Sequence, residues 1–164
     1  MKKIIIAIDS FKGCLTSAEA GKAAEKGIKS INPSCHTSVI PIADGGEGLL
    51  DVLITATKGK YITLSAHGPL MKMAKTHYGL SGNGRTAIIE MAAISGLPLV
   101  PIEQRNPMLT TTFGTGELIK DALNKGCRNF IIGIGGSATN DAGLGMLQAL
   151  GFRFLDKSGH TLGT

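Results

Sequence analysis

Apolar, strand-like runs in this chain end three times in a glycine-containing corner that carries an acidic residue. The corners are residues 8–13, 43–48 and 131–141. In the third corner, glycines give way to small hydroxyl, amide and carboxylate side chains where a helix is predicted to begin. Exposed backbone N–H groups and the positive end of a helix dipole favour an anion such as phosphate at such a position. The sequence therefore predicts an α/β fold with a phosphate-handling site at its strand ends.

Composition excludes several other kinds of protein. The 164 residues suffice for one ordinary domain or for pieces of two. Hydrophobic residues make up 43% of the chain, enough for a core, and charged residues 18%, which is low for a disordered chain. The net charge of +5 comes from scattered lysines, and aromatic residues amount to only 4%. Without a dense basic patch or stacking platforms, no nucleic-acid partner is expected.

Cysteine usage and hydropathy indicate a cytoplasmic protein. Cys14, Cys35 and Cys127 show no CxxC spacing, which argues against a disulfide framework or a zinc site and fits a reducing compartment. The apolar run after Lys3 is too short for a signal peptide. No window approaches about 18 uninterrupted apolar residues, so no membrane-spanning segment is expected.

The first third of the chain alternates strands and helices. Residues 3–8 form a β-branched apolar run typical of a strand buried on both faces of a parallel sheet. Residues 16–19 match a capping box, so a helix is expected to follow through about residue 30. A second strand at 37–43 and a second helix at 49–57 complete the pattern. This rhythm predicts a Rossmann-like segment with parallel pairing.

After residue 59 the pattern changes. Strands are expected at 60–66, 73–80 and 86–91, and the turn signal at 81–84 indicates an antiparallel hairpin. We therefore expect residues 1–66 to belong to the Rossmann-like domain and residues 67–164 to an incomplete mixed α/β domain. Further expected elements are helices at 92–96, 116–125 and 140–150 and a strand at 152–156. Because that last strand has no partner in the sequence, we expect the chain to be the N-terminal part of a longer protein.

Each polar residue at the corners has a structural and a functional interpretation. Residues 44–48 can be simply a tight turn before a helix, or Asp44 or Glu47 can hold Mg²⁺ directly or through water. Lys12 can be a surface charge or a point-charge contact to phosphate or carboxylate. Asp141 can cap a helix, or can position a cation or accept a proton.

Residues 133–138 also fit the GxGxxA dinucleotide fingerprint, and Asp156 ends the next predicted strand about 20 residues on. This match defines an alternative, an NAD(P)-dependent oxidoreductase. A Walker A sequence, GxxxxGK[ST], is absent from the chain, which disfavours the P-loop kinases. A non-catalytic module that binds small molecules is a third hypothesis.

Taken together, four segments resemble the glycerate kinase family, in its bacterial two-domain form. They are residues 9–13, 43–48, 112–118 and 133–141, and their order and spacing cover essentially the whole chain. The resemblance implies two α/β domains, the first Rossmann-like and built from both ends of the chain, the second inserted into it. Family members are roughly twice as long, which again implies an N-terminal portion.

The resemblance also implies ATP-dependent, Mg²⁺-assisted phosphorylation of D-glycerate, giving 2-phosphoglycerate, and it is compatible with a homo-oligomer. Such a reaction asks chiefly for positioning and charge neutralisation. Lys12 would neutralise the glycerate carboxylate or the phosphoryl group. Asp44 or Asp141 would orient the hydroxyl or accept its proton, with the other, or Glu47, near the metal. Substrate and phosphate contacts are expected from Ser10, Gly45, Gly46, Gly135, Gly136, Ser137 and Asn140.

Overall fold

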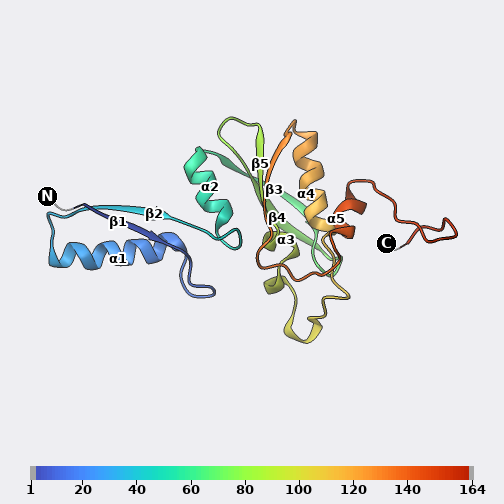
Figure 1. Ribbon diagram of the computed structural model, residues 1–164, viewed down its shortest axis with the longest axis horizontal. Helices are drawn as coiled ribbons and strands as arrows, with labels where there is room; N and C mark the ends of the chain where they lie inside the picture. Colours follow the sequence, from blue (N-terminus) through green and yellow to red (C-terminus); the bar gives the residue numbers. More distant parts are fainter. Residues whose placement is uncertain (1–2, 163–164) are drawn as a thin grey trace.

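The computed structural model describes residues 3–162, whose strands form two separate sheets (Figure 1). The first sheet pairs β1 (Lys3–Ile8) with β2 (His36–Pro41) in parallel, with Ile6 opposite Val39. Helix α1 (Ser17–Ile31) connects the two strands and packs against both. The strand–helix–strand unit predicted for this part of the chain is confirmed.

The start of α1 shows why the helix forms where it does. The backbone N–H of Glu19 donates to the Thr16 hydroxyl at 3.2 Å, and the Glu19 carboxylate accepts the Thr16 N–H at 2.9 Å. This reciprocal pair is the predicted capping box, and it satisfies two backbone donors that a helix start leaves free. Gly21 lies against Val39, where a Cβ atom would clash, so glycine lets the helix approach the sheet closely.

The second sheet has four strands in the order β3 (Lys60–His67), β4 (Met73–Leu80), β5 (Thr86–Glu90) and β6 (Asn129–Gly133). The pairs β3–β4 and β4–β5 are antiparallel, and β5–β6 is parallel. The hairpin expected from the turn signal is therefore present, and the mixed α/β class is confirmed. Because β3 pairs with β4, residues 60–67 lie in this second sheet. The division into domains at residues 66 and 67 stays a prediction.

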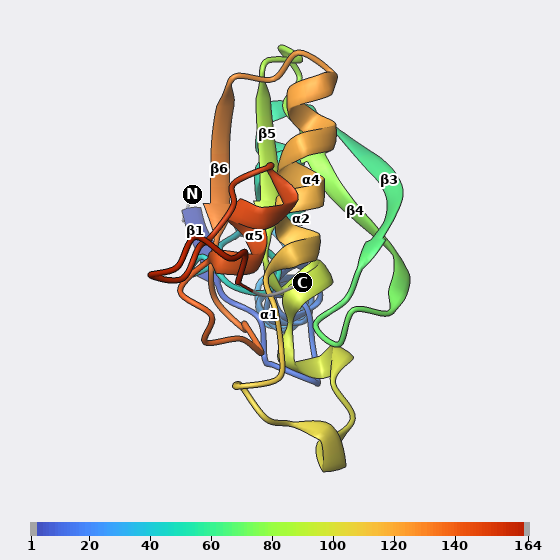
Figure 2. The ribbon, with the colours of Figure 1, turned by 90° about the vertical axis from the view of Figure 1, so that its right-hand side faces the viewer.

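Helices cover both faces of the second sheet. Helix α2 (Leu49–Thr57) lies on one face, where Leu50 and Ile54 pack on Ile88. Helix α4 (Phe113–Asn124) covers the other face, with α5 (Leu144–Ala149) packed against α4 (Figure 2). Three short helices complete the set: α3 (Ala92–Ser95), η1 (Leu97–Leu99) and η2 (Ile102–Gln104).

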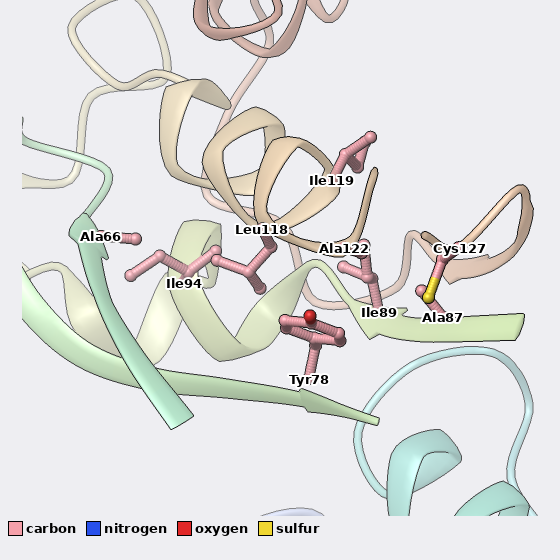
Figure 3. Packing of buried hydrophobic residues seen from close by; sticks show 9 residues of the cluster. All are labelled: Ala66, Tyr78, Ala87, Ile89, Ile94, Leu118, Ile119, Ala122 and Cys127. Carbon is pink, nitrogen blue, oxygen red and sulfur yellow. The ribbon is translucent and has the colours of Figure 1, made fainter. Parts of the chain in front are cut away.

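The largest buried cluster lies between the second sheet and α4 (Figure 3). Tyr78 points from the sheet toward α4, and Ile89, Leu118 and Ala122 beside it are wholly buried. The Tyr78 hydroxyl donates to the Asp121 carboxylate at 2.9 Å, which satisfies the polar end of this side chain. Burial and this hydrogen bond raise the pKa of Tyr78 far above its usual value, so the phenol stays protonated.

Near the C-terminal end, one expected helix begins later than expected and one expected strand is absent. The helix expected at 140–150 begins only at Leu144, because Ala142 (φ 51°) and Gly143 (φ 77°) have left-handed conformations that a right-handed helix cannot contain. The strand expected at 152–156 is absent, and that segment makes only an isolated bridge between Leu155 and Thr161. Among residues 3–162, no neighbouring strand offers it a ladder of hydrogen bonds.

Two further differences concern burial and a helix start. The run at 3–8 is not buried on both faces, since Ile5 is 59% exposed and only Ile6 among its isoleucines is buried. Helix α4 starts at Phe113, ahead of the expected residue 116. Gly114 lets this first turn lie close to β3, because a Cβ atom there would clash with the His67 carbonyl oxygen. None of the helices within residues 3–162 has the length and apolarity needed to cross a bilayer.

Candidate active site

An open cavity of about 920 Å³ lies where the strand-end corners meet. It is bounded by the connection from β1 to α1, the corner before α2, the ends of β5 and β6, and α2 itself. Figure 1 shows the chain crossing from the first sheet to the second through that corner. Seven residues predicted for the site line the cavity: Ser10, Lys12, Asp44, Gly46, Glu47, Gly135 and Gly136. Four others do not: Gly45, Ser137, Asn140 and Asp141.

The second and third corners touch each other directly. The backbone N–H of Gly135 donates to the Gly45 carbonyl oxygen at 3.2 Å. A Cβ atom on Gly135 would lie 2.6 Å from the Gly46 Cα atom, and one on Gly133 would lie 2.6 Å from the Gly45 oxygen. Glycine is therefore required at both positions for the corners to meet. Gly45 contacts the third corner through this hydrogen bond but does not line the cavity.

The corner before α2 presents two carboxylates to the cavity. Asp44 accepts the Gly46 N–H through Oδ1 at 3.0 Å, which closes a tight turn. Its Oδ2 atom accepts no hydrogen bond from the described part of the chain, and Glu47 is exposed at the same surface. Mg²⁺ binds through one or two carboxylates while keeping waters and phosphate oxygens. Asp44 and Glu47 fit that donor set, although residues 3–162 contain no group of three or more His, Cys, Asp and Glu able to hold a metal.

The connection from β1 to α1 brings a lysine to the cavity. The Ser10 N–H donates to the Asp9 carboxylate at 2.6 Å, and the backbones of Phe11 and Leu15 form a bridge. Between them Gly13, at φ 72°, turns the chain. Lys12 is exposed on this turn, and no acidic group in residues 3–162 forms an ion pair with it. Its ammonium group is therefore available to an anionic ligand.

Asp141 lies away from the cavity and holds the start of two helices. Its Oδ2 accepts the N–H and the hydroxyl of Thr112, both at 2.8 Å, and the Gly145 N–H at 3.1 Å, while Oδ1 accepts the Gly143 N–H at 3.0 Å. Burial acts to raise the pKa of Asp141, but these hydrogen bonds to the ionised form outweigh it and lower the pKa. These contacts are those of the helix-capping interpretation, and a catalytic role for Asp141 stays a prediction.

Glu90 and His77 line the cavity without having been predicted for it. Glu90 ends β5, is 8% exposed, and accepts the Leu50 N–H at 3.3 Å. Burial raises the pKa of Glu90, the hydrogen bonds from Leu50 and Gly48 lower it in part, and the net shift is upward. The only sequence signal was a single acid at the carboxyl end of an apolar strand. His77 is exposed on β4, and its position gave no signal.

The fold and this cavity define an α/β protein whose strand-end corners converge on one site. Comparisons with known proteins show to which family of such proteins the chain belongs. Residues 4–164 match the sequence model of the Glycerate kinase family. Glycerate kinase of Bacillus subtilis is 55% identical over 161 residues, and glycerate 2-kinase of Escherichia coli is 51% identical over 161. The chain belongs to the glycerate kinase family.

Structural similarity agrees with this assignment. A crystal structure from Salmonella typhimurium LT2, assigned to glycerate kinase 2, superposes with a TM-score of 0.81 at 49% sequence identity. It matches 98% of this chain, which covers 43% of that structure. The alignments with the B. subtilis and E. coli proteins likewise include 98% of this chain and 42% of each relative. The chain therefore spans less than half the length of these relatives.

The oxidoreductase alternative finds no support in these comparisons. A dinucleotide fingerprint requires its last small residues to open a helix directly after the strand. Here residues 134–143 run as a loop between β6 and α5. The match at 133–138 therefore lacks the structural context that gives the fingerprint its meaning.

Proposed function

We propose that the protein transfers the terminal phosphoryl group of ATP to the C2 hydroxyl of D-glycerate, giving 2-phosphoglycerate and ADP. The observation that supports this most is the convergence of three strand-end segments, far apart in the sequence, on one cavity. They bring an unpaired lysine, two carboxylates and glycine backbone to the same space. Phosphoryl transfer needs this combination of charge neutralisation and positioning.

Each cavity residue has a role in this proposal. Lys12 neutralises the glycerate carboxylate or the transferred phosphoryl group. Asp44, through its free Oδ2, orients the acceptor hydroxyl and takes its proton as the oxygen attacks the terminal phosphorus and ADP leaves. Glu47 would hold Mg²⁺, which when bound neutralises charge on the phosphate oxygens. The Gly136 N–H would donate to a phosphate oxygen, while the Gly135 N–H holds the two corners together through the Gly45 carbonyl oxygen.

Two further observations fit the proposal. The E. coli relative is named a 2-kinase, which favours the C2 hydroxyl as acceptor. Cys14 and Cys127 are free thiols, as expected in the cytoplasm, where ATP is available.

The test is release of ADP in the presence of ATP, Mg²⁺ and D-glycerate, with L-glycerate and a reaction without acceptor as controls. Phosphorus NMR of the product distinguishes 2-phosphoglycerate from 3-phosphoglycerate. Calorimetric titration with ATP and with D-glycerate measures binding separately. Release that depends on D-glycerate and yields the 2-phosphate supports the proposal. Absence of release together with absence of binding of either compound would contradict it.

A further inference from the structure

Glu90 is a buried carboxylate with no positive partner. It is 8% exposed, and within residues 3–162 no lysine, arginine or histidine forms an ion pair with it. Its hydrogen bonds come instead from backbone, from the Leu50 N–H at 3.3 Å and from the Gly48 N–H. An ionised carboxylate in such a place is costly unless it is compensated.

The surroundings of Glu90 increase that cost. Glu47 and Asp51 add negative charge from the corner and from α2, and both act with burial to raise the pKa of Glu90. The other charged or titratable groups lining the same cavity are Asp44 in the corner, His77 on β4, Lys12 and Cys14 on the connection from β1, and Glu19 on α1. Because the folded-state pKa of Glu90 lies above the unfolded value of 4.5, stability falls as the pH rises from 4.5 through the folded-state pKa. A buried carboxyl group kept in such surroundings points to a function.

The contacts of Glu90 show what that function is. Helix α2 begins after Gly48, which has a φ of 89° and offers no side chain to cap the helix. Glu90 supplies the missing acceptor from the sheet, where it meets the positive end of α2. The same corner carries Asp44 and Glu47 and touches Gly135. A carboxylate that fixes the start of α2 therefore also fixes the two acids that face the cavity.

We propose that Glu90 is a positioning residue of the active site, whose carboxyl group holds the corner at residues 44–48 against the sheet. The part of this inference that concerns catalysis rests on the function proposed above. The part that concerns the corner stands on the hydrogen bonds alone.

The test compares Glu90→Gln with Glu117→Gln. Both substitutions remove one charge and keep an acceptor oxygen, and Glu117 likewise accepts a backbone N–H, that of His67 at 2.7 Å, but does not line the cavity. Three quantities are measured: amide exchange at residues 44–50, kcat/KM for D-glycerate, and the midpoint of thermal unfolding. Exchange and kcat/KM are followed across pH, with exchange corrected for its intrinsic pH dependence.

For Glu90→Gln we expect exchange at residues 44–50 to rise and kcat/KM to fall by about tenfold or more. The thermal midpoint at about pH 8 should equal or exceed that of the wild type, because the variant buries no charge. In the wild type, protection of the corner should depend on pH around the folded-state pKa of Glu90, and in the variant this dependence should disappear. Glu117→Gln should lower the thermal midpoint and leave the corner and kcat/KM as in the wild type.

Wild-type exchange and kcat/KM in Glu90→Gln would overturn the inference, and so would a fall in thermal midpoint as large as that of Glu117→Gln. If the wild-type protein shows no D-glycerate-dependent ADP release, the proposed function fails. Exchange at residues 44–50 and its pH dependence then still decide the role of Glu90.

Discussion

The two sheets are built from similar apolar sequences and reach very different degrees of burial. In the first sheet α1 lies against the strands, and Ile4, Ile5 and Ile40 are 37%, 59% and 46% exposed. In the second sheet helices lie on both faces, and Ile88 and Ile89, adjacent on β5, are each fully buried. An apolar β-branched run thus specifies a strand, while its burial is decided by how many layers pack on it.

The largest expected effect is on the free energy of unfolding, which substitutions in the two sheets should lower by different amounts. Leu118→Ala empties a fully buried position between α4 and the second sheet, and should lower the free energy of unfolding by about 2–5 kcal/mol. Ile5→Ala on the exposed face of β1 should cost less than about 1 kcal/mol. Urea titrations of both variants measure the difference. Equal losses would show that the two sheets are buried to the same extent in solution.

A second comparison concerns glycines. Gly135→Ala places a methyl group against Gly46 and should separate the two corners, lowering stability by about 1–3 kcal/mol and reducing turnover. Gly27→Ala in α1 meets nothing within 4 Å and should raise stability by about 0.5–1 kcal/mol. Denaturant unfolding and ADP release follow both variants. A neutral Gly135→Ala would mean that the corners do not touch.

A third prediction concerns Asp141 and pH. Its pKa in the folded protein is below the unfolded value of 3.8, so its contribution to stability is present above 3.8 and is lost as the pH falls through the folded-state pKa. Asp141→Asn should therefore lower the free energy of unfolding at neutral pH by about 1–3 kcal/mol, with the difference shrinking toward acid. Unfolding curves at several pH values check this. A difference that does not depend on pH would exclude the ionised carboxylate as the cap.

Local patterns were enough to predict much of the fold. The capping box at 16–19, the helix at 49–57 and the hairpin of β4 and β5 are present where expected, because each depends on residues near in sequence. The delayed start of α5 was not predictable in this way. Ala142 and Gly143 have left-handed conformations there, beside Asp141, whose carboxylate is hydrogen-bonded to Thr112, 29 positions away in the chain.

The residues of the candidate site likewise fall into two groups, those that local sequence predicts and those that depend on contacts distant in the chain. Ser10, Lys12, Asp44 and Glu47 could be selected because they follow strands, and the ends of parallel strands are where ligands gather in α/β proteins. Glu90 could not be selected from the sequence, because its place in the site depends on a hydrogen bond from the Leu50 N–H, 40 positions away. The contact of the two glycine corners is likewise invisible before the chain is folded.

The central claim is that three segments, residues 9–13, 44–48 and 133–136, form one ligand site. The most direct test is the change in backbone NMR shifts on adding ATP with Mg²⁺ and then D-glycerate. The account predicts that changes concentrate in all three segments at once, while the exposed loop at residues 102–109 stays unchanged. Changes confined to a single segment, or lying mainly outside the three, would contradict it.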